Sequence, residues 1–367
     1  MQELFRRLVS EAPELRTFRE DKPTLLVSWW CTFYAVTVIL FRVCGRYVRT
    51  ERIFKEDGIM LAAIVPLFAR MALVHVILLF GTNNAVITEL SVESIQHREL
   101  GSKFVLASRI IYAAYLWTVK YSTFMFISTL AESFWQNSHK ILMRCIHTFL
   151  IITFVAVVVS DLAACQPFTH YWQVIPDPGI KCRGGYAHLI TMGIANVITN
   201  FTLFLFPLPA IIISRLSKKQ KASIIFRLAL PLLSTAFNMY QIPRVIHTLG
   251  AQPTRSLMAS IDILLATFTA NAVVLASLLQ DRGYKKTKFK QRSVDMGRKM
   301  ELMTARSHAS VVGGRNNRWS SDEDLIIEGE RRNGPIRLQV LKGERPFSDV
   351  SGLEKPDKAK LQEIRVA

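Results

Sequence analysis

Apolar residues gather in seven blocks along the first 280 residues of the chain, and polar, often basic, segments separate the blocks. A helix needs roughly 20 mostly apolar residues to cross the ~30 Å hydrocarbon core of a bilayer, and each block is long enough. The pattern predicts an all-α, polytopic membrane protein with about seven transmembrane helices. We place these helices at about residues 24–43, 58–80, 104–131, 145–165, 186–214, 223–246 and 257–280.

The third block is about 28 residues long and contains Arg109 and Lys120. At 1.5 Å per residue, one helix of that length spans about 42 Å, more than the hydrocarbon core requires. Two crossings do not fit in this length. We therefore expect a single helix that tilts or extends beyond the bilayer.

The pattern divides the chain into three regions: a short polar segment at 1–23, a seven-helix membrane domain at 24–285, and a basic tail at 286–367. Residues 281–367 contain 20 Lys and Arg and 13 Asp and Glu, without a sustained apolar period. Such a composition is typical of disordered segments, because it cannot bury enough apolar surface to offset its chain entropy. The basic run at 285–292 is expected to bind anionic lipid head groups.

The formal net charge is +18, which in a soluble protein would suggest nucleic acid as a partner. Here the basic residues border apolar blocks, so lipid is the expected partner and nucleic acid is not. The basic segments 44–57, 215–222 and 282–290 alternate with loops that hold only two basic residues each. This alternation predicts an outside N-terminus and a cytosolic C-terminus, although the five basic residues of segment 1–23 favour the reverse. We expect the membrane to be the plasma membrane.

Several local motifs resemble the fungal rhodopsin-domain integral membrane proteins, a receptor-like family of seven-helix proteins. They are Arg42 and Arg46 followed by KEDG at 55–58, YLWTVKYS at 115–122, CQPFTHYW at 165–172 followed by Cys182, Asn196, PLP at 207–209, and Arg244. The resemblance covers about residues 24–285, and the motif at 165–172 is its most specific part. It implies a receptor-like seven-helix domain.

The sequence departs from that family pattern at three places. Asn200 stands where the family usually has aspartate, Asp262 stands where it has glutamate, and the late proline of the seventh helix is missing. A retinal cofactor is bound as a Schiff base to a lysine in the last helix, and residues 257–280 contain no lysine. We therefore predict no retinal.

Ionisable residues inside a membrane are costly, so each is a candidate for function. Arg109 and Lys120 are eleven residues apart, which places them on one helical face together with Tyr112. Arg109 is expected to pair with Asp161 or Asp262 and to line a ligand cavity open to the outside. The alternative is that Arg109 reaches the lipid head groups as a structural cation. The candidate ligand-binding residues are Arg70, Arg109, Tyr112, Lys120, Asp161 and Asp262.

Cys165 and Cys182 flank the loop between the fourth and fifth helices. In an oxidising compartment they can form a disulfide that holds Tyr171 and Trp172 over the cavity. The alternative is two free thiols, with Trp172 anchored at the membrane interface. The five cysteines form no CxxC pair, so no metal site is expected.

The chain contains no HExxH, GxSxG or P-loop motif, and we do not expect an enzyme. Three functions remain open. The first is a receptor-like protein that senses an extracellular ligand and signals to a cytosolic protein through its inner loops and tail. The second is a small-molecule transporter or exporter, and the third is a non-signalling membrane scaffold.

Overall fold

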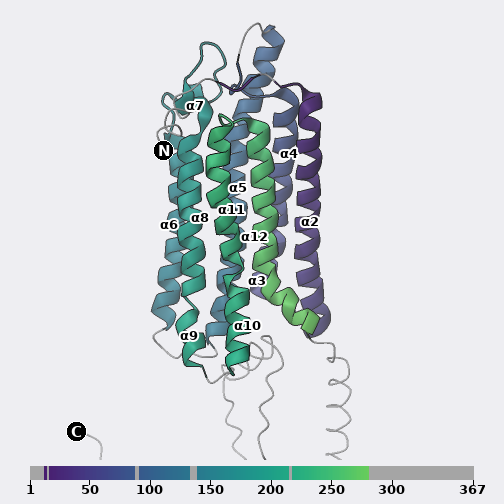
Figure 1. Ribbon diagram of the computed structural model, residues 1–367, viewed down its shortest axis with the longest axis vertical. Coiled ribbons are helices and arrows are strands. Elements are labelled where there is room, and N and C mark those ends of the chain that lie inside the picture. The colour runs from purple at the N-terminus through teal and green to yellow at the C-terminus, as the bar shows by residue number, and fades with distance from the viewer. Residues whose placement is uncertain (1–11, 15, 87–90, 133–138, 215–216, 281–367) are drawn as a thin grey trace, which may run out of the picture.

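The computed structural model describes residues 12–14, 16–86, 91–132, 139–214 and 217–280. Within these residues every regular element is helical and no strand is present, as Figure 1 shows. The predictions for the basic tail and for the anionic-lipid segment at 285–292 fall outside the described residues. The helices are α2 (Phe18–Thr50), α3 (Lys55–Ala62), α4 (Ile64–Phe80), α5 (Val92–Glu132), α6 (His139–Ala163), η1 (Phe168–Tyr171), α7 (Ile180–Gly184), α8 (Tyr186–Leu205), α9 (Leu208–Ile213), α10 (Lys218–Ala229), α11 (Pro231–His247) and α12 (Gln252–Gln280).

Seven long segments pass along the bundle, and three of them are broken into two helices each: α3 with α4, α8 with α9, and α10 with α11. Two of the breaks fall at Pro207 and Pro231. Proline has no backbone N–H and its ring obstructs the preceding turn, so a helix bends or ends there. The third break, at Ala63, lies three residues before Pro66, which cannot donate a backbone hydrogen bond to the carbonyl of Ala62.

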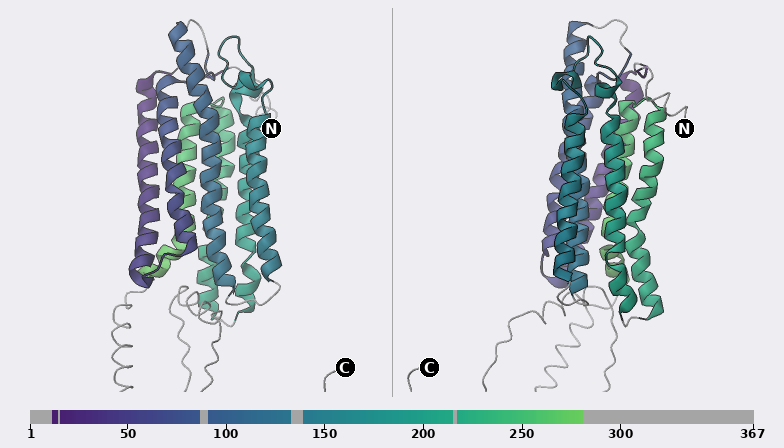
Figure 2. Two further views of the ribbon diagram at one scale, coloured as in Figure 1. Left: turned by 180° about the vertical axis from the view of Figure 1, so that it is seen from behind. Right: turned by 90° about the vertical axis from the view of Figure 1, so that its left-hand side faces the viewer.

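Helix α5 is 41 residues long and unbroken. At 1.5 Å per residue it measures about 62 Å, and Figure 2 shows it extending past its neighbours at one end of the bundle. The same end carries the loop between α6 and α8, and we refer to it as the disulfide end. The long third helix expected from the sequence therefore does extend beyond the others.

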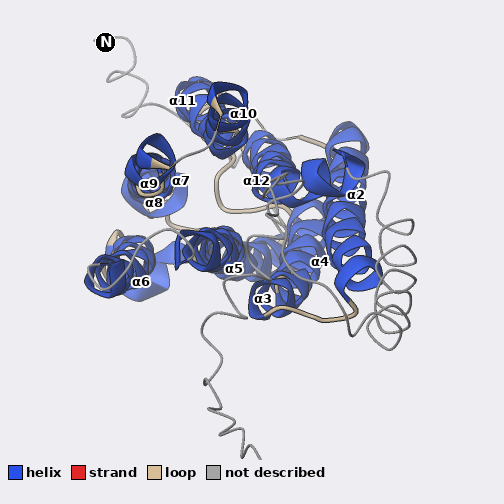
Figure 3. Cartoon of the chain, turned by 90° about the horizontal axis from the view of Figure 1, so that it is seen from below, coloured by secondary structure: helices blue, strands red, loops and turns tan. Residues whose placement is uncertain are grey.

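The helices form one bundle in which α5 packs against α3, α4, α6, α8 and α12. Figure 3 shows this arrangement in a view from below, opposite the disulfide end. Helix α12 closes the bundle by packing along α2 and against α11. The central apolar cluster joins buried side chains from α2, α4, α5 and α12, including Ile39, Leu67, Leu116 and Ile263.

The outer surface of the bundle is apolar. Phe41, Ile152 and Phe226 are 66%, 59% and 70% exposed. Large apolar side chains that face outward on several long helices are typical of a surface covered by lipid. Six stretches of the described helices are long and apolar enough to cross a membrane: Phe18–Thr50, Lys55–Phe80, Val92–Thr129, Ile141–Ala163, Tyr186–Leu205 and Lys221–His247.

Helix α12 is the seventh crossing, since its 29 residues run the length of the bundle beside α2. The chain is thus an integral, multi-pass membrane protein. Helix α2 begins and α12 ends at opposite ends of the bundle, as an odd number of crossings requires.

Two segments predicted as basic loops are partly helical. Helix α2 continues to Thr50, so Arg46 and Arg49 are helical and buried rather than free in a loop. Lys218, Lys219 and Lys221 belong to α10. The apolar blocks alone did not reveal these extensions, because helix ends in membrane proteins can be polar.

Candidate functional site

A cavity of about 660 Å³, with the open space at its mouth included, lies between α4, α5, α8, α11 and α12 near the disulfide end. We refer to it as the arginine pocket, because three of its lining residues are arginines and none is Asp or Glu. Its lining includes Arg70, Tyr112, His188, Gln241 and Arg255 together with Arg109, Val74, Val105, Leu189, Met192 and Ile242.

Arg109 pairs with Asp161, with 3.4 Å between Nη1 and Oδ1. The Asp161 side chain is 2% exposed and comes from α6, outside the lining of the pocket. His188 Nδ1 lies 3.9 Å from the same carboxylate oxygen. Of the two partners that the sequence left open for Arg109, the structure brings Asp161 to it and not Asp262.

Asp262 instead accepts three hydrogen bonds from neutral groups. Its donors are Tyr112 Oη at 2.6 Å, Ser234 Oγ at 2.9 Å and Asn238 Nδ2 at 3.0 Å. This carboxylate, which is 0% exposed, therefore ties α5 and α11 to α12 behind the wall of the pocket. Hydrogen bonds to a carboxylate are stronger than hydrogen bonds between two neutral groups, so the bond to Asp262 fixes the position of Tyr112.

Arg70 is 2% exposed and has no carboxylate partner within 4 Å among the described residues. It donates to Ser260 Oγ at 2.9 Å and to the carbonyl of Ser256 at 3.1 Å. Its guanidinium also lies over the Tyr112 ring, 5.8 Å from the centroid. The cation therefore depends on neutral acceptors and an aromatic face.

Lys120 lies deeper, at a second and smaller cavity that it shares with Asn196 and Asn200. Its ammonium donates to the side-chain oxygens of both asparagines. Asn200 in turn donates to Thr235 Oγ1 at 3.0 Å, which links the group to α11. The structure thus gives Lys120 a neutral amide partner at the position where the resemblance would place an aspartate.

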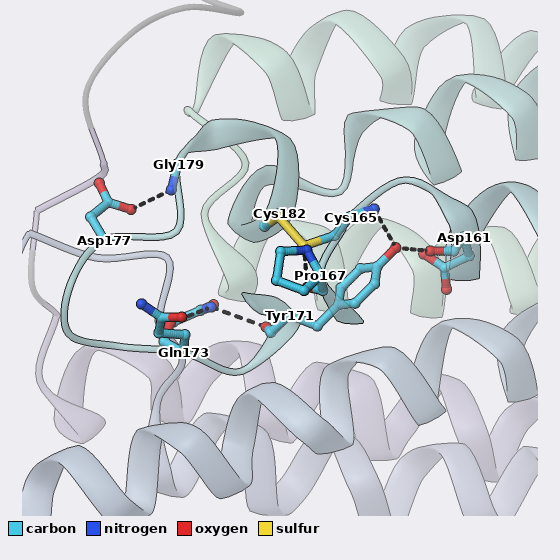
Figure 4. The surroundings of a disulfide bond; sticks show 9 residues. Asp161, Cys165, Pro167, Tyr171, Gln173, Asp177, Gly179 and Cys182 are labelled. Carbon is cyan, nitrogen blue, oxygen red and sulfur yellow. Dashed lines mark hydrogen bonds between the residues drawn. A yellow bond between two sulfur atoms is a disulfide. The ribbon is translucent and has the colours of Figure 1, made fainter. Parts of the chain in front are cut away.

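Cys165 and Cys182 form a disulfide that closes the loop between α6 and α8. Within this loop the Tyr171 hydroxyl donates to the carbonyl of Asp161 and accepts from the backbone N–H of Cys165 at 3.0 Å, as Figure 4 shows. Burial raises the pKa of the Tyr171 hydroxyl, so it remains a donor at neutral pH. The loop therefore contacts the helix that carries the Arg109 counter-ion.

The middle of the same loop is held by Asn83, which lies in the connection between α4 and α5. Its side-chain amide donates to the carbonyls of Tyr171 and Gln173 at 3.0 and 3.1 Å. Trp172 is half-buried beneath Lys103, whose ammonium lies 5.4 Å from the ring centroid. Tyr171 and Trp172 are thus part of a packed cap at the disulfide end.

Two consecutive glycines, of which the first is two residues after Cys182, connect this cap to the pocket. Arg255 donates to the carbonyl of Gly184, and the Arg109 guanidinium lies directly against Gly185, where any side chain would collide with it. Gly185 has a φ of +56°, a left-handed conformation that favours glycine. The turn at Gly184 and Gly185 therefore places the guanidiniums of Arg109 and Arg255 next to each other.

A separate ionic cluster lies at the opposite end of the bundle. Asp57 accepts hydrogen bonds from Arg42 Nε at 3.0 Å and from Arg46 Nη1 at 2.9 Å, and Glu56 accepts from Arg46 at 3.2 Å. Arg42 also donates to Asn271 on α12 at 3.1 Å. Both arginines are 0% exposed, so this cluster joins α2, α3 and α12 in the interior.

Sequence reasoning missed His188, Arg255 and this ionic cluster. Arg255 was counted only as a loop cation, and His188 stands at a helix start that carries no motif. The approach of these residues to Arg109 depends on the packing of three helices that are distant in the sequence, so no local pattern could reveal it. The adjacent Gly184 and Gly185 were the one local signal of a close backbone approach.

The pairing of Arg109 with Asp161 can be measured by a double-mutant cycle on the free energy of unfolding. Arg109→Gln and Asp161→Asn each leave one charge buried without its partner, and we expect the two effects to be non-additive by about 1–3 kcal/mol. A cycle of Arg109→Gln with Asp262→Asn is the matched control, with a smaller expected coupling. Equal coupling in the two cycles would contradict the assignment of Asp161 as the partner.

Metal ligands do not gather anywhere in the described residues, where no group of three His, Cys, Asp or Glu side chains could hold an ion.

Among known protein families, the model of the fungal rhodopsin domain matches residues 41–281. No curated protein and no solved structure matches the chain. The matched range contains the arginine pocket, the disulfide and the ionic cluster.

Proposed function

The chain belongs to the fungal rhodopsin-domain family, and from that premise we propose that it is a receptor-like protein that senses a small molecule in the arginine pocket. The observation that carries the proposal is a pocket lined by three arginines at one end of the bundle and a buried ionic cluster at the other. Two helices, α5 and α12, take part in both. A ligand that shifts either helix can therefore change the opposite end.

The proposed role is binding, and the proposed ligand is not retinal, because α12 holds no lysine that could form a Schiff base. We place the disulfide end outside the cell and the tail in the cytosol of a plasma-membrane protein. An oxidising exterior supports this direction, because the disulfide would persist there. The cations of α10 would then face a cytosolic signalling partner.

Native cysteines provide the test. Cys44 and Cys145 are exposed, Cys31 is buried, and the other two are bridged. In a Cys44→Ser variant, an environment-sensitive fluorophore would label Cys145 on α6. Cys145 is sixteen residues from Asp161, or about 24 Å along the helix.

Soluble metabolites are first screened for those that raise the Tm of the purified protein. Under the proposal, a hit changes the emission of the label at Cys145, and variants of pocket residues abolish both effects. A hit that stabilises the protein without any change at Cys145 would contradict sensing.

A transporter is the second candidate, and one observation favours it. The Lys120 cavity lies among the broken segments α8 with α9 and α10 with α11, and interrupted helices near a buried cation are typical of substrate paths. The discriminating measurement is flux of the same hit into proteoliposomes that contain no other protein. Flux that is lost in Lys120→Gln would favour the transporter.

A further inference from the structure

The charges that line the arginine pocket are not balanced within its wall. Arg70, Arg109 and Arg255 line it, and no Asp or Glu does. Asp161 neutralises Arg109 from outside the lining. The hydrogen bonds of Arg70 and Arg255 go to serine and backbone oxygens only, so two guanidiniums in the described bundle face the cavity without a carboxylate.

Hydrogen-bonding groups at the same place are also unused. Arg255 Nε is buried and has no hydrogen-bond partner. His188 Nδ1 is in the same state, and His188 as a whole is 6% exposed. Such groups normally find a partner, because a buried polar group left unpaired loses its bond to water and gains none in return. Both residues line the pocket, so a ligand that enters it can provide the missing partner.

The rest of the wall is mixed. Gln241 Oε1 is a buried acceptor without a partner, and the other neutral polar residues of the lining are Ser108, Asn238, Gln252 and Ser256. Val74, Val105, Leu189, Met192 and Ile242 come from four different helices and surround the cavity. These side chains can cover a short alkyl chain or a ring but can form no hydrogen bond with it. The pocket thus combines a cationic corner, fixed by the Gly184 and Gly185 turn, with a body in which apolar side chains stand among neutral polar ones.

We propose that the ligand of the arginine pocket is a small amphipathic carboxylate, with its head group on Arg255 beside Arg109 and its apolar part along Met192 and Ile242. This inference rests on the proposed sensing function and adds the chemical class of the ligand. The planar guanidinium fork matches the two oxygens of a carboxylate, and an ammonium ligand would meet only like charge. A neutral ligand would leave Arg70 and Arg255 without a carboxylate in direct contact.

The test compares four six-carbon probes on the full chain in nanodiscs of phosphatidylcholine, which contribute no net negative head group. The probes are hexanoate, 1-hexanol, hexylammonium and hexyl phosphate. We expect hexanoate to bind at least about tenfold more tightly than 1-hexanol or hexylammonium, because a hydrogen bond to a charged group contributes about 1.5–3 kcal/mol. Equal binding of 1-hexanol, or no binding of hexanoate, would overturn the proposal.

Variants locate the head group. Arg255→Gln should weaken hexanoate about tenfold or more and leave 1-hexanol unchanged. Arg244→Gln is the matched control, because Arg244 is exposed on α11 near the same end and does not line the pocket. An unchanged hexanoate affinity in Arg255→Gln overturns the assignment. If that variant fails to fold, the comparison of the four probes on the unaltered chain still tests the proposal.

Hexyl phosphate separates two anion classes. If it binds more tightly than hexanoate with the same dependence on Arg255, the assignment of a carboxylate is overturned.

The label at Cys145 separates this inference from the proposed function. If hexanoate binds through Arg255 without a change in emission, the proposed sensing function is contradicted and the carboxylate class is not. If a neutral metabolite binds in the pocket and changes the emission, the carboxylate class of the ligand is contradicted and the sensing function is not.

Discussion

Asp57→Asn is expected to lower the free energy of unfolding by about 3–5 kcal/mol. Asp57 accepts hydrogen bonds from Arg42 and Arg46, and the three side chains are at most 2% exposed. Removal of this carboxylate leaves two buried guanidiniums with Glu56 as their remaining acid in the cluster. An uncompensated buried charge is much more costly than the loss of one hydrogen bond.

The measurement is a denaturation curve in mixed detergent micelles, together with the Tm. Asp177→Asn is the control, because Asp177 is 54% exposed in its ion pair with Arg183 in the α6–α8 loop. Solvent at the Asp177 carboxylate screens this pair, so its loss should cost less than that of the buried cluster. A second arm combines Asp57→Asn with Arg42→Gln, which restores the charge balance and should regain part of the loss. A Tm for Asp57→Asn equal to that of the Asp177 control would contradict the role given to the ionic cluster.

Cys182→Ser is expected to lower the free energy of unfolding by about 3 kcal/mol. In the chain-entropy model, a bridge that closes a loop of this size restricts the unfolded chain by about that amount. The change also releases the turn at Gly184 and Gly185 that positions Arg109 and Arg255. We therefore expect weaker ligand binding in addition to lower stability.

Thermal unfolding with and without reductant measures this effect. Reductant should lower the Tm of the unaltered protein to that of Cys182→Ser and should not affect the variant. Cys44→Ser is the control, since Cys44 is exposed and free, and its Tm should remain unchanged. Reaction of both Cys165 and Cys182 with a maleimide in the native protein would show that the bridge is not formed.

The seven crossings were predictable because each depends on a local property, the length of an apolar block. The breaks at Pro207 and Pro231, and the break at Ala63 three residues before Pro66, also have a local cause. The positive-inside rule treated Arg46 as a free loop cation. Its burial follows from a tertiary contact with Glu56 and Asp57, which charge counting does not consider.

The candidate site was predictable only in part, for a similar reason. Helical periodicity places Arg109, Tyr112 and Lys120 on one face, and the structure turns that face inward. The choice between Asp161 and Asp262 depends on how α6 and α12 are rotated about their axes. Periodicity within one helix contains no information about the rotation of another, so the partner and the roles of His188 and Arg255 required the assembled bundle.

The uninterrupted length of α5 constrains how the two ends can communicate. It carries Arg109 and Tyr112 at the pocket, and Ser122 Oγ donates to the Glu56 carbonyl at 2.8 Å beside the ionic cluster. Because α5 has no break, a displacement of its residues at the pocket is transmitted to the ionic cluster as a tilt or a rotation of the whole helix. The jointed segments around it, with their breaks at Ala63, Pro207 and Pro231, are where such a motion would be accommodated.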